Sequence, residues 1–160
     1  MIACPSTFDN GGAGADNESL MEVTLAVVAD YANISREGKL NILGVFSEIN
    51  PPSLPFRLPQ MFLVASIETA ATEAGREFPV QVLLVDDDGD ERLSLEQTLA
   101  VPPPPRPGEG RTINQIMGLA GIRFDQAGHY AFHILISGEE RRSIRLRVNE
   151  PLGNRGDQSG

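Results

Sequence analysis

The chain has 160 residues, of which 41% are hydrophobic and 22% charged, and its formal net charge is −9 at pH 7. This length fits one domain that buries a sizeable core. The acidic balance argues against nucleic-acid and anionic-membrane partners, because both are bound by clustered Lys and Arg. No apolar run approaches the roughly 20 residues of a membrane-spanning helix. We therefore expect no nucleic-acid partner and no membrane partner.

The two ends of the chain differ from its interior. Residues 1–19 are rich in Gly, Ala, Asn, Asp and Ser and predict a disordered leader, and residues 151–160 predict a flexible tail. Residues 20–150 then form the single domain. The opening MIACPSTFDNGG lacks the basic and apolar segments of a secretory signal, and Cys4 is the only cysteine, so we expect a cytoplasmic protein. Without an export signal, the RGD at Arg155–Asp157 is interpreted as a chance tripeptide.

A hairpin is the clearest structural signal in the chain. The run EVTLAVVADYANIS, which begins at Glu22, and the run LNILGVFSEI, which ends at Ile49, are joined by the polar turn REGK. Similar short segments and turn signals recur as far as Val148. The predicted strands are Glu22–Ala29, Leu40–Ile49, Met61–Thr69, Phe78–Val85, Arg92–Val101, Thr112–Phe124, His129–Ser137 and Arg142–Asn149.

Two Pro-rich segments separate some of these strands. PPSLPFRLP at residues 51–59 is expected to be extended and irregular, because each Pro removes a donor and fixes its own φ. PPPPRPGEG at residues 102–110 is expected to be stiffened towards polyproline II. Thr112–Phe124 fits neither the strand nor the helix period well, and its two glycines indicate either a bulged strand or a short helical turn before one.

Alternation along the strands predicts the fold class. In the last two predicted strands every second residue is apolar, and these residues define the face expected in the core: Tyr130, Phe132, Ile134, Ile136, Ile144, Leu146 and Val148. Half-buried antiparallel strands give this pattern, and no segment shows a helical stripe. The sequence therefore predicts an all-β, antiparallel, two-sheet Greek-key sandwich of the immunoglobulin-like class, with about eight strands. A small barrel is the alternative.

Tyr130 follows a pair of small residues, Ala127 and Gly128, and opens an alternating strand. A tyrosine near this position in immunoglobulin-like domains donates its hydroxyl to the backbone a few residues upstream. We favour this structural role for Tyr130 over a ligand contact.

A wider set of segments within residues 22–150 carries a more particular resemblance. These segments are ADYANISREGKLNILGVFSEI, a Pro-rich loop, LVASIE, VDDDGDE and FDQAGHYAFHILISG. Together they resemble a bacterial family of domains of unknown function whose members begin with an aspartate-bearing strand and a hairpin of the GKLNILGVF type. The resemblance implies an immunoglobulin-like or related β-sandwich in a bacterial cytoplasmic protein, and it implies no catalytic residues.

The run DDDGDE at residues 86–91 is the most conspicuous candidate for a metal site. Its alternate aspartates open like an EF-hand loop, but Glu91 stands where that loop needs its sharp-turn Gly, and Gln97 stands where it needs its bidentate Glu. A calcium site between the loops of a sandwich would need carboxylates from a second loop. We therefore interpret the run as a charged hairpin turn at Asp88-Gly89 and expect no tight calcium binding.

Four other residues are candidates for a functional role. His129 and His133 share one strand face, but zinc needs further ligands and Cys4 lies far away in sequence, so we expect two solvated or rim histidines. Ser137 has no nucleophile elbow around it. Asp30 follows an apolar run and could be a buried, hydrogen-bonded structural carboxylate.

The chain has one basic cluster, in its last predicted strand. The cluster could bind an acidic partner, but Glu139 and Glu140 lie beside it and the fifth predicted strand carries further acids. Cross-strand ion pairing on a solvated face is therefore the expectation. The residues of the cluster are Arg141, Arg142, Arg145 and Arg147.

Two function classes remain after these exclusions. The first is a non-enzymatic protein-binding or scaffold module without metal or cofactor, and the shortage of convergent polar groups favours it. The alternative is an enzyme or accessory subunit with a site that the spacing of residues does not reveal. This alternative stays open because fold alone does not decide function.

Association is the remaining expectation for a protein of this class. The first and third predicted strands, at VTLAVVA and MFLVASI, are nearly free of polar residues. At a sheet edge, or with both faces open, they would pair with a second copy or an unknown protein partner by strand addition or sheet packing. The opposing interpretation makes both strands central, with the Pro-rich loops covering their second faces. We favour association, because an apolar strand needs cover on both sides.

Overall fold

The computed structural model describes residues 21–152, and the predicted leader, with Cys4, and the tail beyond Leu152, with Arg155–Asp157, lie outside the described residues. In the described part no helix is long and apolar enough to cross a membrane. Its elements, in chain order, are β1 (Glu22–Ile34), β2 (Leu40–Phe46), β3 (Glu48–Ile49), β4 (Phe56–Thr69), the 3₁₀ turn η1 (Ala71–Glu73), β5 (Glu77–Val85), β6 (Glu91–Ala100), β7 (Arg111–Phe124), β8 (Gly128–Ile136) and β9 (Glu139–Val148).

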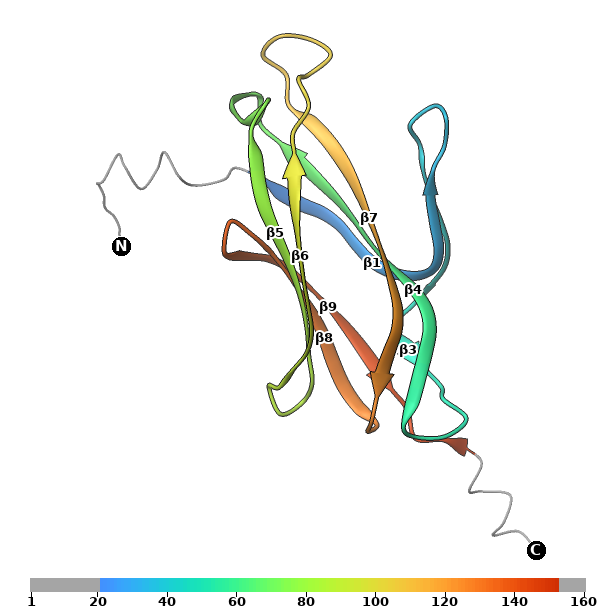
Figure 1. Cartoon of the computed structure of the whole chain (residues 1–160). Helices are drawn as coiled ribbons and strands as arrows, with labels where there is room; N and C mark the ends of the chain where they lie inside the picture. The colour runs from blue at the N-terminus through green and yellow to red at the C-terminus, as the bar shows by residue number, and fades with distance from the viewer. Residues whose placement is uncertain (1–20, 153–160) are drawn as a thin grey trace, which may run out of the picture.

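These strands form two sheets that face each other (Figure 1). The four-stranded sheet has the order β2–β1–β4–β7 and the five-stranded sheet the order β3–β9–β8–β5–β6. Hairpins join β1 to β2, β5 to β6 and β8 to β9, and the remaining connections cross between the sheets. The predicted antiparallel Greek-key sandwich is confirmed, and the barrel alternative is wrong. One pair departs from the antiparallel pattern, because β3 runs parallel to β9.

The core lies between the sheets and is built from alternate residues of each strand. In β8 the predicted inward residues, from Tyr130 to Ile136, are all buried, and in β9 Leu146 and Val148 are buried while Ile144 packs against the core. Phe124 of β7 and Phe132 of β8 are among its largest fully buried side chains. The alternation in the sequence therefore identified the core face correctly.

Four predicted boundaries are wrong by more than one residue. β9 begins at Glu139 and not at Arg142, because Glu139 and Glu140 already pair with β8. β1 continues past Ala29 to Ile34, because the polar residues of ADYANI pair with β2 in an extended ladder. The predicted strand Leu40–Ile49 divides at Ser47, where the chain leaves the four-stranded sheet and β3 joins β9. The first Pro-rich segment is not irregular throughout, because β4 already begins at Phe56.

Thr112–Phe124 belongs entirely to one strand, β7, so the alternative of a helical turn is wrong. Its irregularity is local. The register places Gly121 opposite Pro59 of β4, since Ala120 pairs with Gln60 and Ile122 pairs with Leu58. Gly121 has a φ of +68° at the point where the proline cannot donate to the ladder.

The first and third predicted strands correspond to β1 and β4, which are the central strands of the four-stranded sheet. The alternative that either lies at a sheet edge is therefore wrong. The edges of this sheet are β2 and β7.

Candidate functional site

The acidic run forms the turn between β5 and β6. The N–H of Asp86 donates to the carbonyl of Asp90 at 3.0 Å, and the N–H of Gly89, whose φ is +83°, donates to the carbonyl of Asp86 at 3.0 Å. The Asp86 carboxylate closes the turn by accepting from the N–H of Asp88 at 3.0 Å and of Asp90 at 2.9 Å. The predicted charged hairpin turn is confirmed.

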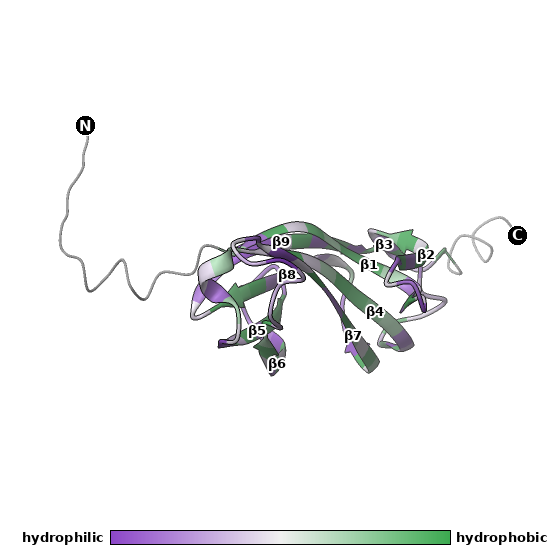
Figure 2. Ribbon diagram, turned by 90° about the horizontal axis from the view of Figure 1, so that it is seen from above, coloured by the Kyte–Doolittle hydropathy of each residue, from purple (hydrophilic) through white to green (hydrophobic). Residues whose placement is uncertain are grey.

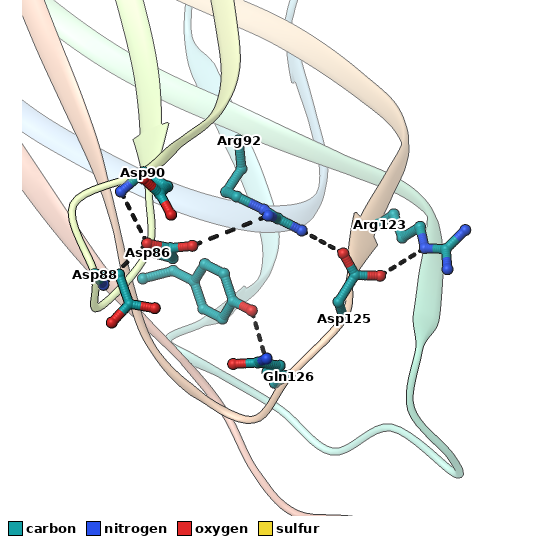
Figure 3. A network of polar contacts seen from close by, with 8 residues as sticks. Asp86, Asp88, Asp90, Arg92, Arg123, Asp125 and Gln126 are labelled. Carbon is teal, nitrogen blue, oxygen red and sulfur yellow. Dashed lines mark hydrogen bonds and ion pairs between the residues drawn. The ribbon is translucent and has the colours of Figure 1, made fainter.

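Arg92 lies between this turn and a second loop, the one that follows β7 (Figure 3). Its guanidinium approaches the Asp86 carboxylate at 4.0 Å and donates to the carboxylate of Asp125. Carboxylate oxygens of Asp86, Asp88 and Asp90 lie within 4.8 Å of one another, and Arg92 places a positive charge of the chain itself beside them. The absence of tight calcium binding stays a prediction, and Arg92 supports it.

Asp125 joins two arginines across this end of the sandwich. Arg123 donates through Nε to the Asp125 carboxylate at 2.6 Å, and Arg123 and Arg92 together hold the pKa of Asp125 below its ordinary value. The Asp125 carboxylate in turn raises the pKa of Arg92. Because the carboxyl pKa is lower in the folded chain, the stabilisation exists at neutral pH and is lost as the pH falls through that lowered pKa. The network ties the β5–β6 turn to the loop after β7.

Tyr130 has the predicted structural role. Its hydroxyl donates to the carbonyl of Gln126 at 2.7 Å, and its ring meets Phe124 edge-on with 5.0 Å between the ring centroids. Burial raises the pKa of the Tyr130 hydroxyl. The side chain therefore fixes the corner between β7 and β8, as in immunoglobulin-like domains.

We expect Tyr130→Phe to destabilise the domain by about 1 kcal/mol, because it removes one hydrogen bond and leaves the Gln126 carbonyl unpaired. Urea unfolding followed by circular dichroism measures the change. The control is Thr98→Val, which removes an exposed hydroxyl of β6 and should lose less than about 0.5 kcal/mol. Equal losses in the two variants would contradict the corner role.

The two histidines lie on the outer face of the five-stranded sheet. His129 and His133 flank Ala131 on β8, which confirms that they share a face. Four residues along a strand span roughly 13 Å, so the two rings are not brought to one metal ion. His133 donates through Nδ1 to Glu140 at 2.7 Å, whereas the His129 ring has no polar partner among residues 21–152. The predicted rim histidines are confirmed.

The four arginines of β9 differ in whether they have an interaction partner. Arg141 pairs with Glu139 of its own strand at 3.1 Å, and Arg142 donates to the carbonyl of Val23 at 3.2 Å. The side chains of Arg145 and Arg147 make no ion pair or hydrogen bond within residues 21–152. The expected cross-strand ion pairing is wrong for these two residues. β8 and β5 separate β9 from the acids of β6, and Glu48 of β3, although paired in register with Arg147, makes no ion pair with it.

Two further candidates lie away from these groups. Asp30 is exposed, so the interpretation as a buried carboxylate is wrong. It lies against the bend of β2 at Gly44, where φ is +72° and a Cβ would be 2.5 Å from Oδ2 of Asp30. Ser137 lies in the exposed turn between β8 and β9 and donates its backbone N–H to the carbonyl of Pro79.

The outer face of the four-stranded sheet is apolar towards its β2 edge. Leu43, Val45 and Tyr31 are 65%, 59% and 48% exposed. Leu43 is paired in register with Tyr31, whose ring packs edge-on against Phe62 at 5.7 Å. Green, hydrophobic residues predominate along β2 and β4 in Figure 2. The uncharged residues that the register places on the middle and the β2 side of this outer face are Val27, Ala29, Tyr31, Asn33, Asn41, Leu43, Val45, Phe62, Val64, Ile116 and Gly118. Charged residues of the same face lie at its two ends, Glu22 and Glu68 at one and Arg57 and Arg123 at the other.

The exposed apolar face along β2 and the contact between Arg92 and Asp125 were not predicted from the sequence. The face had a signal, because LNILGVF places apolar residues on both sides of one strand: Leu40, Ile42 and Phe46 on one, Leu43 and Val45 on the other. The ion pair had none, because its partners lie 33 residues apart.

The two sheets, the crossing connections and the tyrosine corner together define an immunoglobulin-like β-sandwich module. The chain belongs to a family of unknown function, DUF6941, whose model matches residues 24–149. The resemblance to a family of domains of unknown function is thereby confirmed. No curated protein matches the sequence.

Solved structures with similar folds include three that come from different kinds of protein. The alkylpurine DNA glycosylase AlkC of Pseudomonas fluorescens, bound to DNA, matches 82% of this chain at 14% identity with a TM-score of 0.46, and the chain covers 31% of its length. The C-terminal domain of Wzt matches 83% at 15% identity, with a TM-score of 0.45 and 75% of its length covered. An immunoglobulin-like protein of Pseudomonas aeruginosa matches 83% at 13% identity, with a TM-score of 0.39 and 99% covered. Such similarities carry no argument about function.

Proposed function

We propose that this domain is a non-enzymatic, cytoplasmic protein-interaction module that pairs with a second copy of itself through the outer face of the four-stranded sheet. The observation that supports the proposal is the joint exposure of Tyr31, Leu43 and Val45 on the apolar, β2 side of one face. A contiguous exposed apolar patch on a globular protein marks an interaction site.

Charge favours a second copy as the partner. The chain carries a net charge of −9, yet the apolar middle of this face has no charged side chain, because the charges of the face, Glu22 with Glu68 and Arg57 with Arg123, lie at its two ends. Two copies related by a two-fold axis bring the same neutral surface together from both sides, and the apolar centre of such an interface excludes charge.

Packing of sheet on sheet fits this face better than addition of a strand at its β2 edge. The edge strand β2 has a φ of +72° at Gly44, and this bend interrupts the extended edge that an added strand would need. The residues before and after the bend, Leu43 and Val45, remain exposed on the outer face.

The use made of polar groups supports a non-enzymatic role. Arg92 and Asp125 connect two loops, His133 pairs with Glu140, and Tyr130 fixes a corner. An enzyme or accessory subunit is the alternative. Turnover in a general hydrolase panel that His129→Ala abolishes would favour that alternative.

We expect light scattering on the purified chain to give twice the monomer mass, and Leu43→Lys to give the monomer mass. A lysine at this position would bury a charge at the centre of the interface. The matched control is Thr98→Lys on the exposed face of β6, which should leave the dimer intact. A monodisperse wild-type monomer at high concentration would contradict the proposed partner.

A further inference from the structure

A second surface, on the other sheet, has chemistry of its own. The outer face of β5, β8 and β9 contains a hollow of about 370 Å³. Val85 and Ala131 are paired in register at its floor, and the side chains of His129, His133 and Arg145 border it. An apolar floor with a few polar groups around it, at this volume, suits a small ligand.

Two acids, Asp86 and Asp87, also line this hollow, and both already accept hydrogen bonds from backbone N–H groups of the chain. Asp86 accepts two hydrogen bonds of its own turn and lies near Arg92. Asp87 accepts from the backbone N–H of His129 at 3.0 Å. At the opposite end, Glu140 accepts from the ring of His133. These carboxylates are therefore partly compensated within the chain.

The cations beside the hollow are not engaged. Within residues 21–152 the guanidinium of Arg145 has neither an ion pair nor a hydrogen bond. Arg147, paired in register with His129, is likewise free within that range and borders an adjoining hollow with Glu150. Two unused guanidinium groups and an unused imidazole thus converge on one face of an acidic chain.

We propose that this hollow binds an organic anion whose carboxylate or phosphate group is held by Arg145 beside His129, and whose small apolar body lies on Val85 and Ala131. A guanidinium forms paired, charge-assisted hydrogen bonds with either group. The site lies on the five-stranded sheet, whereas the self-association face lies on the four-stranded sheet. Failure of one proposal therefore leaves the other unaffected.

Titration of the full ¹⁵N-labelled chain with benzoate and with phenyl phosphate tests this site. We expect saturable amide shifts at His129, Ala131 and His133, with a dissociation constant of about 1 mM or tighter for at least one anion. Tighter binding of phenyl phosphate assigns the site to phosphates, and tighter binding of benzoate assigns it to carboxylates. Benzyl alcohol, which has the same ring without the charge, should give no saturable shift.

Three variants complete the test. Arg145→Gln should weaken binding of the preferred anion at least tenfold, and Ala131→Leu, which fills the floor, should abolish it. Arg106→Gln, in an exposed loop, is the charge-matched control and should bind as the wild type does. The proposal is overturned if neither anion gives saturable shifts, if benzyl alcohol binds equally well, or if Arg145→Gln binds unchanged.

Discussion

Phe124→Ala is expected to cost the domain about 3–5 kcal/mol of its free energy of unfolding. Phe124 is fully buried between the sheets, and its ring supports Tyr130 at the corner before β8. The truncation removes apolar burial and leaves a cavity in a core that holds no Trp. Because a domain of this size is stable by only about 5–15 kcal/mol, the loss should be plain in urea unfolding.

A second phenylalanine provides the comparison for this variant. Phe56, paired in register with Phe124 at the start of β4, is only half-buried. Phe56→Ala should therefore lose less than half as much stability. Similar losses in the two variants would show that the interior of the sandwich is not centred where the structure places it.

Gly110→Ala is expected to destabilise the domain by about 2–3 kcal/mol. A Cβ at Gly110 would lie 2.2 Å from the carbonyl oxygen of Thr69, and a backbone atom cannot move aside as a flexible side chain can. The next residue, Arg111, is the first of β7 and accepts a hydrogen bond from the Thr69 hydroxyl at 2.8 Å. Relief of the clash would therefore disrupt the first pairs between β4 and β7.

The neighbouring glycine separates this clash from a general effect of alanine in the loop. Gly108 has a φ of +83° and no atom within 4 Å of its would-be Cβ. Gly108→Ala should cost only about 1 kcal/mol, which is the strain of a left-handed backbone conformation. A larger loss at Gly108 than at Gly110 in urea unfolding would contradict the packing at the start of β7.

Much of the fold was predictable because it depends on local patterns. Alternation along β8 and β9 identified the buried face, since successive side chains of a strand point to opposite sides. The corner at Tyr130 was predictable because the tyrosine and the backbone carbonyl it binds lie four residues apart. The switch of sheets at Ser47 was not, because it depends on β9, about 100 residues further along the chain.

The order of strands across the sheets explains what the sequence did not reveal about the sites. Arg145 and Arg147 were expected to meet acids of the fifth predicted strand, but two strands lie between. Arg92 meets Asp125 because the start of β6 and the end of β7, which belong to different sheets, lie at the same end of the sandwich. Residue spacing predicts neither the missing ion pairs nor this contact, since the order of strands in a sheet is set by pairing between distant segments.

The exposed apolar face could be predicted from the sequence only in part. The apolar residues of β2 were visible in the sequence, but their exposure depends on tertiary structure, because no element of residues 21–152 packs over this outer face. Tyr31 of the central strand β1 is exposed on the same face for the same reason.

Dilution of the ¹⁵N-labelled chain, followed by amide chemical shifts, tests the self-association face most directly. We expect concentration-dependent shifts at Tyr31, Leu43 and Val45 and constant shifts at His133 and Arg145, because only the outer face of the four-stranded sheet enters the interface. Shifts that do not change with concentration, or changes confined to the five-stranded sheet, would contradict the proposed interaction.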